Sequence, residues 1–141
     1  MNQPVVQFHP NNKDMILYED FLISFFHKNK MYNITIKEEF IYDGASIPEF
    51  AWSLIGSPFT GEYRIPALVH DAFYKCADRG IFGREDVDCI FETLMSQFGE
   101  DTTTNFIIYQ AVDKFGGSSW DDGSKTRANK AEFLNIEVND V

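Results

Sequence analysis

The most constraining feature of this sequence is a pair of amphipathic segments joined by a short turn. Residues 66–77 and 84–98 both repeat apolar side chains at steps of three and four, the period of a helix with one buried face. Only "DRGIFG" separates them, so we expect the two helices to pack antiparallel. The stripes consist of Val69, Ala72, Phe73 and Cys76 in the first helix and Val87, Ile90, Phe91, Leu94, Met95 and Phe98 in the second.

The segment before this pair predicts strands. Residues 15–42 are rich in aromatic and β-branched side chains, and "HKNK" interrupts two partly alternating runs, which indicates a β-hairpin or small meander. The run from Phe21 to Phe26 is almost continuously apolar, so we expect that strand to be covered on both faces or to lie against helices. The pattern favours an α+β fold, in which the hairpin or meander packs on three or four helices around the central antiparallel pair.

Length and the remaining motifs complete the expected organisation. The chain has 141 residues, enough for one packed domain, with loop-like ends at 1–14 and about 118–141, although "FLNIEV" could form a late strand. The stretch "SIPE" carries a helix-start signature and predicts a short helix to about Ile55. A further helix is expected from near Thr102 to "FGG". Its expected inward residues are Ile108, Ala111, Val112 and Phe115.

Composition excludes several classes of protein. A net charge of −10 and a pI near 4.6 repel phosphates and anionic lipid, so general nucleic-acid binding is not expected, although a divalent cation is compatible with this charge. The start "MNQPVVQFHPNN" lacks a signal-peptide pattern, and no apolar run approaches the roughly 20 residues of a transmembrane segment. Cys76 and Cys89 fall on different sides of their helices and should not pair. We expect a cytoplasmic-type protein with reduced thiols.

Three polar residues lie at the edges of the two apolar stripes. His70 and Tyr74 are four residues apart on the first helix, and Asp88 can face them from the second. A carboxylate that accepts the proton of one imidazole nitrogen fixes the tautomer and raises the basicity of the other nitrogen, which can then take a proton from water. The alternative, which stays open, is a buried histidine whose hydrogen bonds only lock two helices together.

A separate carboxylate suggests a metal site. Asp71 projects well away from His70 and Tyr74 at about 100° per residue, so it can serve a different ligand. The loop "GSPFTG", with Gly56 and Gly61, can expose backbone carbonyls, and calcium prefers oxygen ligands of both kinds. Such a cation would polarise a bound carbonyl and stabilise the oxyanion formed by attack.

Two motifs carry a resemblance to a known family. "HDAFY" and "VDCIF" resemble the catalytic helix and the partner helix of phospholipase A2, especially its disulfide-poor viral form, and "GSPFTG" loosely resembles its calcium loop. The resemblance covers roughly residues 56–94. It implies that His70 activates water, Asp88 orients His70 and Tyr74 supports them. It also implies that Asp71 binds calcium, and that the chain hydrolyses an ester such as a lipid.

A second set of motifs covers more of the chain, from about residue 40 to Trp120. "DGASIPEFAW", "VHDAFY" and "AVDKFG" together resemble the phage and prophage family of domain of unknown function 1353. This resemblance implies a phage origin but does not supply the reaction. We expect a place in the phage virion or the host cytoplasm, with lipid or other virion proteins as partners. Two functions stay open: a calcium-assisted ester hydrolase, and a non-catalytic virion or assembly component, associated with tail or capsid, in which the polar residues are structural.

Overall fold

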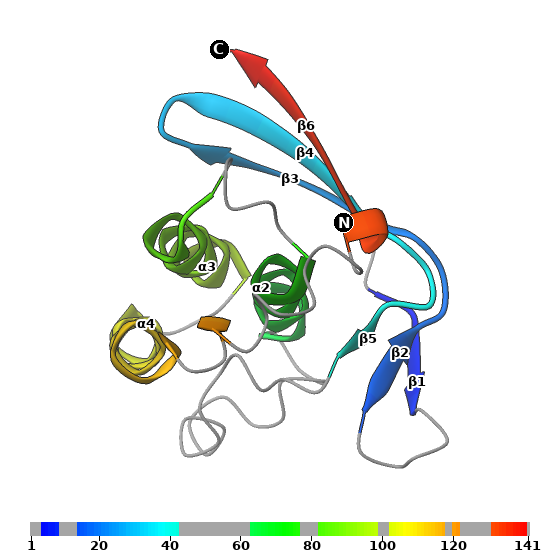
Figure 1. Cartoon of the computed structure of the whole chain (residues 1–141). Coiled ribbons are helices and arrows are strands. Elements are labelled where there is room, and N and C mark those ends of the chain that lie inside the picture. Colours follow the sequence, from blue (N-terminus) through cyan, green and yellow to red (C-terminus); the bar gives the residue numbers. More distant parts are fainter. Residues whose placement is uncertain are drawn as a thin grey trace.

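The computed structural model describes residues 4–8, 14–42, 63–76, 82–98, 102–117, 120–121 and 131–140. Within these ranges two three-stranded antiparallel sheets lie against three helices, which confirms the expected α+β fold (Figure 1). The first sheet has the order β1-β2-β5 and the second β3-β4-β6. The strands are β1 (Val6–Phe8), β2 (Met15–Leu17), β3 (Phe21–His27), β4 (Lys30–Ile36), β5 (Ile41–Tyr42) and β6 (Leu134–Asp140), and the helices are α2 (Arg64–Cys76), α3 (Arg84–Phe98) and α4 (Thr102–Phe115).

The β3–β4 hairpin forms the base of the second sheet. Its turn residues Lys28 and Asn29 both have positive φ angles, 51° and 64°. These are the angles of a two-residue type I′ turn, whose twist matches that of the flanking strands, and His27 pairs with Lys30 across it. β6 then pairs antiparallel with β4, so the late strand expected at "FLNIEV" is present.

Helices cover only one face of this sheet. Buried and exposed side chains alternate along β3, so that Phe25 packs against Phe73 of α2 whereas Leu22 and Phe26 are 66% and 55% exposed. For the apolar run from Phe21, packing against helices is therefore confirmed and cover on both faces is wrong. The pleat explains the outcome, because successive side chains point to opposite faces and the described helices all lie on one side (Figure 1).

The antiparallel helix pair lies at the centre of the fold. The ring of His70 on α2 packs at a tilt against the ring of Phe91 on α3, with the ring centroids 4.5 Å apart. One turn later on α2, Tyr74 contacts Arg84 at the start of α3. Buried side chains of both helices join both sheets in one apolar cluster. Trp120 also belongs to this cluster, and its ring lies edge-on to Tyr74 at 5.1 Å.

Three expectations about the rest of the chain need comment. The ends are not wholly loop-like, since residues 1–14 contain β1 and residues 118–141 contain β6, each held by backbone hydrogen bonds to a neighbouring strand. Ile108, Ala111 and Val112 of α4 are buried as expected, but Phe115 is 56% exposed. At this end of α4 the position that lies beside Tyr74 and Arg84 is that of Gly116 rather than that of Phe115. The helix expected up to about Ile55 lies outside the described residues.

Among the described residues no helix combines the length and the apolar composition needed to cross a bilayer.

Asp86 joins the β3–β4 turn to the first turn of α3. Its carboxylate lies 2.8 Å from Lys28 Nζ and 3.0 Å from His27 Nε2, and it accepts a hydrogen bond from the backbone N–H of Gly83 at 3.1 Å. The hydrogen bond with Lys28 lowers the pKa of Asp86 to about 2, although burial opposes the shift. A carboxyl group with a lowered folded-state pKa stabilises the fold above its ordinary pKa and loses that contribution as the pH falls through the folded-state value.

We therefore expect Asp86→Asn to lower the free energy of unfolding by about 1 kcal/mol at pH 7, a value reduced because solvent screens this partly exposed group. The difference from wild type should shrink as the pH falls from about 4 to about 2. Urea denaturation at pH 7 and pH 2.5 measures both effects. Glu85→Gln, an exposed acid in the same turn, is the matched control and should change little. A constant difference at both pH values would contradict the role assigned to Asp86.

Candidate functional site

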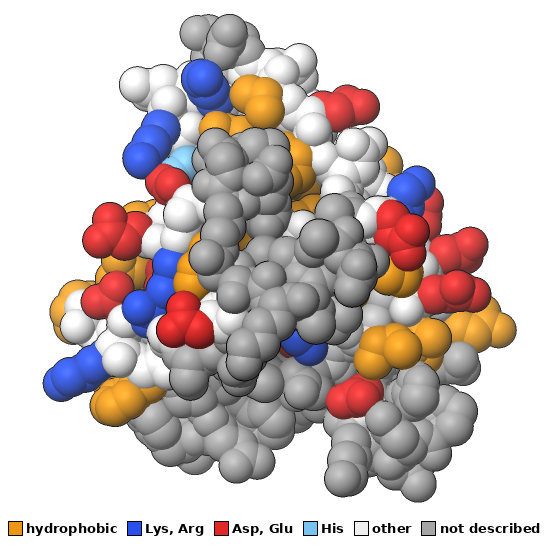
Figure 2. Space-filling model, viewed as in Figure 1, with side chains coloured by type: hydrophobic (Ala, Val, Ile, Leu, Met, Phe, Trp, Pro, Cys, Tyr) orange, Lys and Arg blue, Asp and Glu red, His pale blue; other side chains and the backbone are white. Residues whose placement is uncertain are grey.

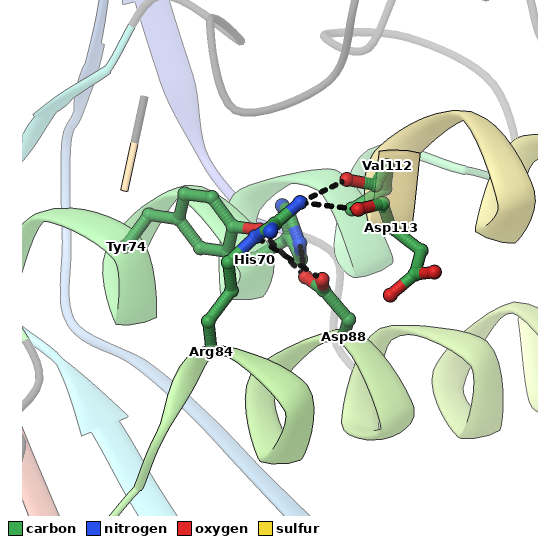
Figure 3. Close-up of polar contacts among 6 residues, drawn as sticks. All are labelled: His70, Tyr74, Arg84, Asp88, Val112 and Asp113. Atoms are coloured by element: carbon green, nitrogen blue, oxygen red, sulfur yellow. Dashed lines mark hydrogen bonds and ion pairs between the residues drawn. The ribbon is translucent and has the colours of Figure 1, made fainter. Parts of the chain in front are cut away.

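His70, Tyr74 and Asp88 meet in the core between α2 and α3 (Figure 3). Asp88 Oδ1 lies 2.8 Å from His70 Nε2 and 2.7 Å from Tyr74 Oη. They meet because His70 and Tyr74 are one turn apart on α2 and Asp88 faces both from the antiparallel helix. The convergence expected from their spacing is confirmed. All three are deeply buried, each about 1% exposed.

The hydrogen bonds of this group have defined directions. Burial, followed by the charge of Asp88, raises the pKa of Tyr74 far above its ordinary value, so the phenol stays protonated and donates to the carboxylate. An ionised carboxylate only accepts, so an ionised Asp88 would receive the Nε2–H of His70 and leave the ring lone pair on Nδ1. The Tyr74 and Phe91 rings, at 4.2 and 4.5 Å, hold the imidazole from two sides. This tautomer can take a proton at Nδ1.

Arg84 completes the group, although no motif in the sequence singled it out. It begins α3 one turn before Asp88, with Nε 3.7 Å from Asp88 Oδ2 and 3.4 Å from Tyr74 Oη. Its Nη2 donates to the carbonyls of Val112 and Asp113 in the last turn of α4 (Figure 3). An arginine and an aspartate four residues apart on one helix were the available signal. We call four side chains the His70 cluster: His70, Tyr74, Arg84 and Asp88.

Gly116 lets the end of α4 approach this cluster. A Cβ atom at this position would lie 2.9 Å from Tyr74 Oη and 2.6 Å from the carbonyl oxygen of Val112. Both distances are shorter than real Cβ contacts, so the close approach requires glycine. The sequence had indicated only that Gly116 suits a helix end.

Asp71 follows His70 on α2 and is directed to other neighbours. It is fully buried, and its Oδ2 lies 3.9 Å from Lys75 Nζ. The pKa of Tyr42 is raised first by the burial of Tyr42 and then by the charge of Asp71. The contact with Lys75 agrees with the expected helical phase, which turns Asp71 away from His70. Gly56 and Gly61, the expected calcium loop, lie outside the described residues. Among the residues that are described, no group of three or more His, Cys, Asp or Glu side chains could hold a metal ion.

The two cysteines behave as the helical phase predicts. Cys76 is buried and Cys89 exposed, and neither takes part in a disulfide.

Asp88 should contribute strongly to stability, because its removal leaves two buried donors without their acceptor and the Arg84 guanidinium without its counter-ion. We expect Asp88→Ala to lower the free energy of unfolding by about 3 kcal/mol. Asp113→Ala is the control: it also removes a carboxylate near Arg84, but an exposed one, and it keeps the backbone carbonyl that Arg84 binds, so its effect should be below about 0.5 kcal/mol. Urea denaturation measures both. Similar losses for the two variants would show that Asp88 is not buried among these donors.

Comparison with known proteins places the chain in a family. An uncharacterized protein, y4jT, of Sinorhizobium fredii (strain NBRC 101917 / NGR234) is 49% identical over 37 residues, which cover 26% of this chain and only 11% of that protein. No solved structure matches the chain. A family model described as "Protein of unknown function (DUF1353)" matches residues 17–112, a range that is more than half of the chain and contains the whole His70 cluster. The chain therefore belongs to the DUF1353 family.

Proposed function

We propose that this protein is an ester hydrolase of phospholipase A2 type, in which His70 is the general base. The observation that carries the proposal is the buried 2.8 Å contact between His70 Nε2 and Asp88 Oδ1, with Tyr74 donating to the same oxygen. A histidine held in one tautomer by a carboxylate is the arrangement that general-base catalysis needs. The resemblance of "HDAFY" and "VDCIF" to the phospholipase A2 helices supports the same reading.

The reaction uses the lone pair of the imidazole ring. His70 Nδ1 takes a proton from water as the water oxygen attacks the ester carbonyl carbon. Asp88 stabilises the imidazolium that forms, because the carboxylate accepts its Nε2–H. The bond between the carbonyl carbon and the alcohol oxygen then breaks, and His70 returns the proton to the departing alkoxide. The products are a carboxylic acid and an alcohol, and His70 ends in its starting state.

Calcium is the cofactor that we propose for this reaction. When bound, it would stabilise the negative charge on the carbonyl oxygen. Asp71 is the charged ligand proposed for it, a carboxylate next to His70 in sequence but directed to other neighbours. Backbone carbonyls around Gly56 and Gly61 would supply further oxygen ligands, which suit calcium better than magnesium.

The charge of the surface guides the choice of substrate. Figure 2 shows acidic side chains on both flanks of this face, in line with the net charge of −10. Such a surface is repelled by anionic membranes. We therefore propose a zwitterionic lipid as the ester.

The hydrolase proposal predicts that wild-type protein releases fatty acid from zwitterionic phospholipid vesicles in calcium and not in chelator. His70→Gln keeps a similar volume, so the fold should persist while the activity falls by about 100-fold or more. Asp71→Asn should stay inactive even at millimolar calcium, because the charged ligand is lost. His27→Gln makes the same change at a histidine outside the cluster and should keep the activity. No release by the wild type with zwitterionic, anionic or mixed vesicles would remove the hydrolase proposal.

A second candidate function is a non-catalytic phage virion or assembly component. The observation that favours it is the uncovered outer face of the β3-β4-β6 sheet, where Leu22 and Phe26 are largely exposed. A hollow of about 470 Å³ adjoins Leu22 on this face. Large apolar side chains exposed among polar neighbours such as Ser24 and Asn33 are found at protein interaction sites. In this function the His70 cluster serves only to hold α2, α3 and α4 together.

The assembly proposal predicts a defect at the sheet face and none at the imidazole. In a phage that encodes the protein, the Leu22→Ser/Phe26→Ser double variant should fold normally, because both side chains are exposed, but should fail to enter particles. His70→Gln should enter particles as the wild type does. Particle composition by immunoblotting is the measurement. Normal incorporation of the double variant would rule out this face as the assembly surface.

A further inference from the structure

We propose that Arg84 is a positioning residue of the His70–Asp88 pair: it sets the direction of the hydrogen bonds that fix the His70 tautomer. Arg84 touches neither the imidazole nor, in the proposed reaction, the ester, so its effect passes through Tyr74 and Asp88. As a statement about catalysis this inference rests on the proposed hydrolase function. As a statement about the His70 tautomer it stands on the geometry alone.

The direction of the chain of hydrogen bonds begins at the guanidinium. A guanidinium can only donate, so Tyr74 Oη accepts from Arg84 Nε at 3.4 Å. The phenol proton is then directed to Asp88 Oδ1, 2.7 Å away. Since Asp88 accepts at that oxygen, His70 must donate to it through Nε2. The donation from Arg84 thus adds to the charge of Asp88 in directing the phenol proton toward the carboxylate, and the imidazole proton follows.

The charge of Arg84 acts on the same carboxylate directly. Asp88 Oδ2 is buried and has no hydrogen-bond partner in the described part of the chain. Arg84 Nε lies 3.7 Å from this oxygen and supplies a compensating positive charge. A buried carboxylate without a compensating cation favours its protonated form, because burial penalises the charge. A protonated Asp88 could donate to His70 Nε2, which would move the imidazole proton to Nδ1 and remove the base.

The end of α4 fixes the guanidinium in this place. Nη2 donates to two successive carbonyls of the last helical turn, those of Val112 and Asp113 (Figure 3). Gly116 leaves the space that the guanidinium and the Tyr74 hydroxyl occupy. The planar fork of arginine suits this task, since it reaches the carbonyls and the phenol at the same time. α4 thereby orients Arg84, and Arg84 orients the pair.

A purely structural role for Arg84, as a cap on the α4 carbonyls, would predict a different result. Loss of the cap would lower stability but leave the His70 tautomer unchanged, since Asp88 and Tyr74 remain. The positioning role predicts that the tautomer changes even in a folded variant. Arg84→Lys isolates the contribution of the charge, because lysine keeps a cation near Asp88 but cannot bond the carbonyls and the phenol together.

The experiment compares wild type, Arg84→Gln, Arg84→Lys and the control Glu85→Gln at one fixed pH. Nitrogen-15 NMR of the histidine ring reports which nitrogen carries the proton, and circular dichroism confirms folding. We expect the Nε2–H tautomer in wild type, in Glu85→Gln and in Arg84→Lys, and a shift toward Nδ1–H in Arg84→Gln. Vesicle hydrolysis adds a second readout, in which Arg84→Gln should lower kcat by about 10- to 100-fold at unchanged KM.

The outcomes separate this inference from the proposed function. A folded Arg84→Gln with the wild-type tautomer would overturn the positioning role, whatever the activity. If Arg84→Gln does not fold, the neutral Arg84→Met takes its place, and a wild-type tautomer there would overturn the role. Loss of Nε2–H in Arg84→Lys despite the retained cation would also overturn it. If the wild type hydrolyses no ester, the hydrolase proposal fails while the ring tautomers still test Arg84.

Discussion

The buried carboxylate of Asp88 is the constraint around which this structure is arranged. A charge taken out of water is costly unless donors replace the lost hydration. In this core the donors come from α2, as His70 and Tyr74, and the compensating cation is Arg84 at the start of α3. Because Arg84 also binds carbonyls of α4, the single carboxylate links three helices. If the helices shifted relative to one another, the carboxylate would lose these donors and its counter-ion.

Side chains in the first turns of α3 contact three different parts of the fold. Arg84 reaches the end of α4, Asp86 holds the turn of the β3–β4 hairpin, and Asp88 faces α2. Arg84 and Asp88, four residues apart, share one face of α3 and both contact Tyr74, whereas Asp86 projects from another face of the helix. One short stretch of sequence thus aligns the sheet and both neighbouring helices. Val87, in the same stretch, is buried in the apolar cluster and anchors this turn in the core.

The same cluster is compatible with both functions that we propose. A general base needs a fixed tautomer, and a structural core needs satisfied polar groups, so the contacts among His70, Tyr74 and Asp88 meet both requirements. What distinguishes the two functions lies elsewhere. The hydrolase depends on Asp71 and a calcium ion, whereas the assembly component depends on the uncovered sheet face around Leu22 and Phe26. Membership of the DUF1353 family is common ground for both.

The sequence by itself determined the helix pair and the meeting of His70, Tyr74 and Asp88, because helical periodicity is local and a short turn leaves one antiparallel arrangement. It did not reveal Arg84, whose partners on α4 lie 28 and 29 residues away and become neighbours only when three helices pack. Nor could the continuous apolar run of β3 tell which face would stay open, since that depends on where the helices lie. Local patterns specify elements and their edges; the identity of distant partners is decided by packing, which no single segment encodes.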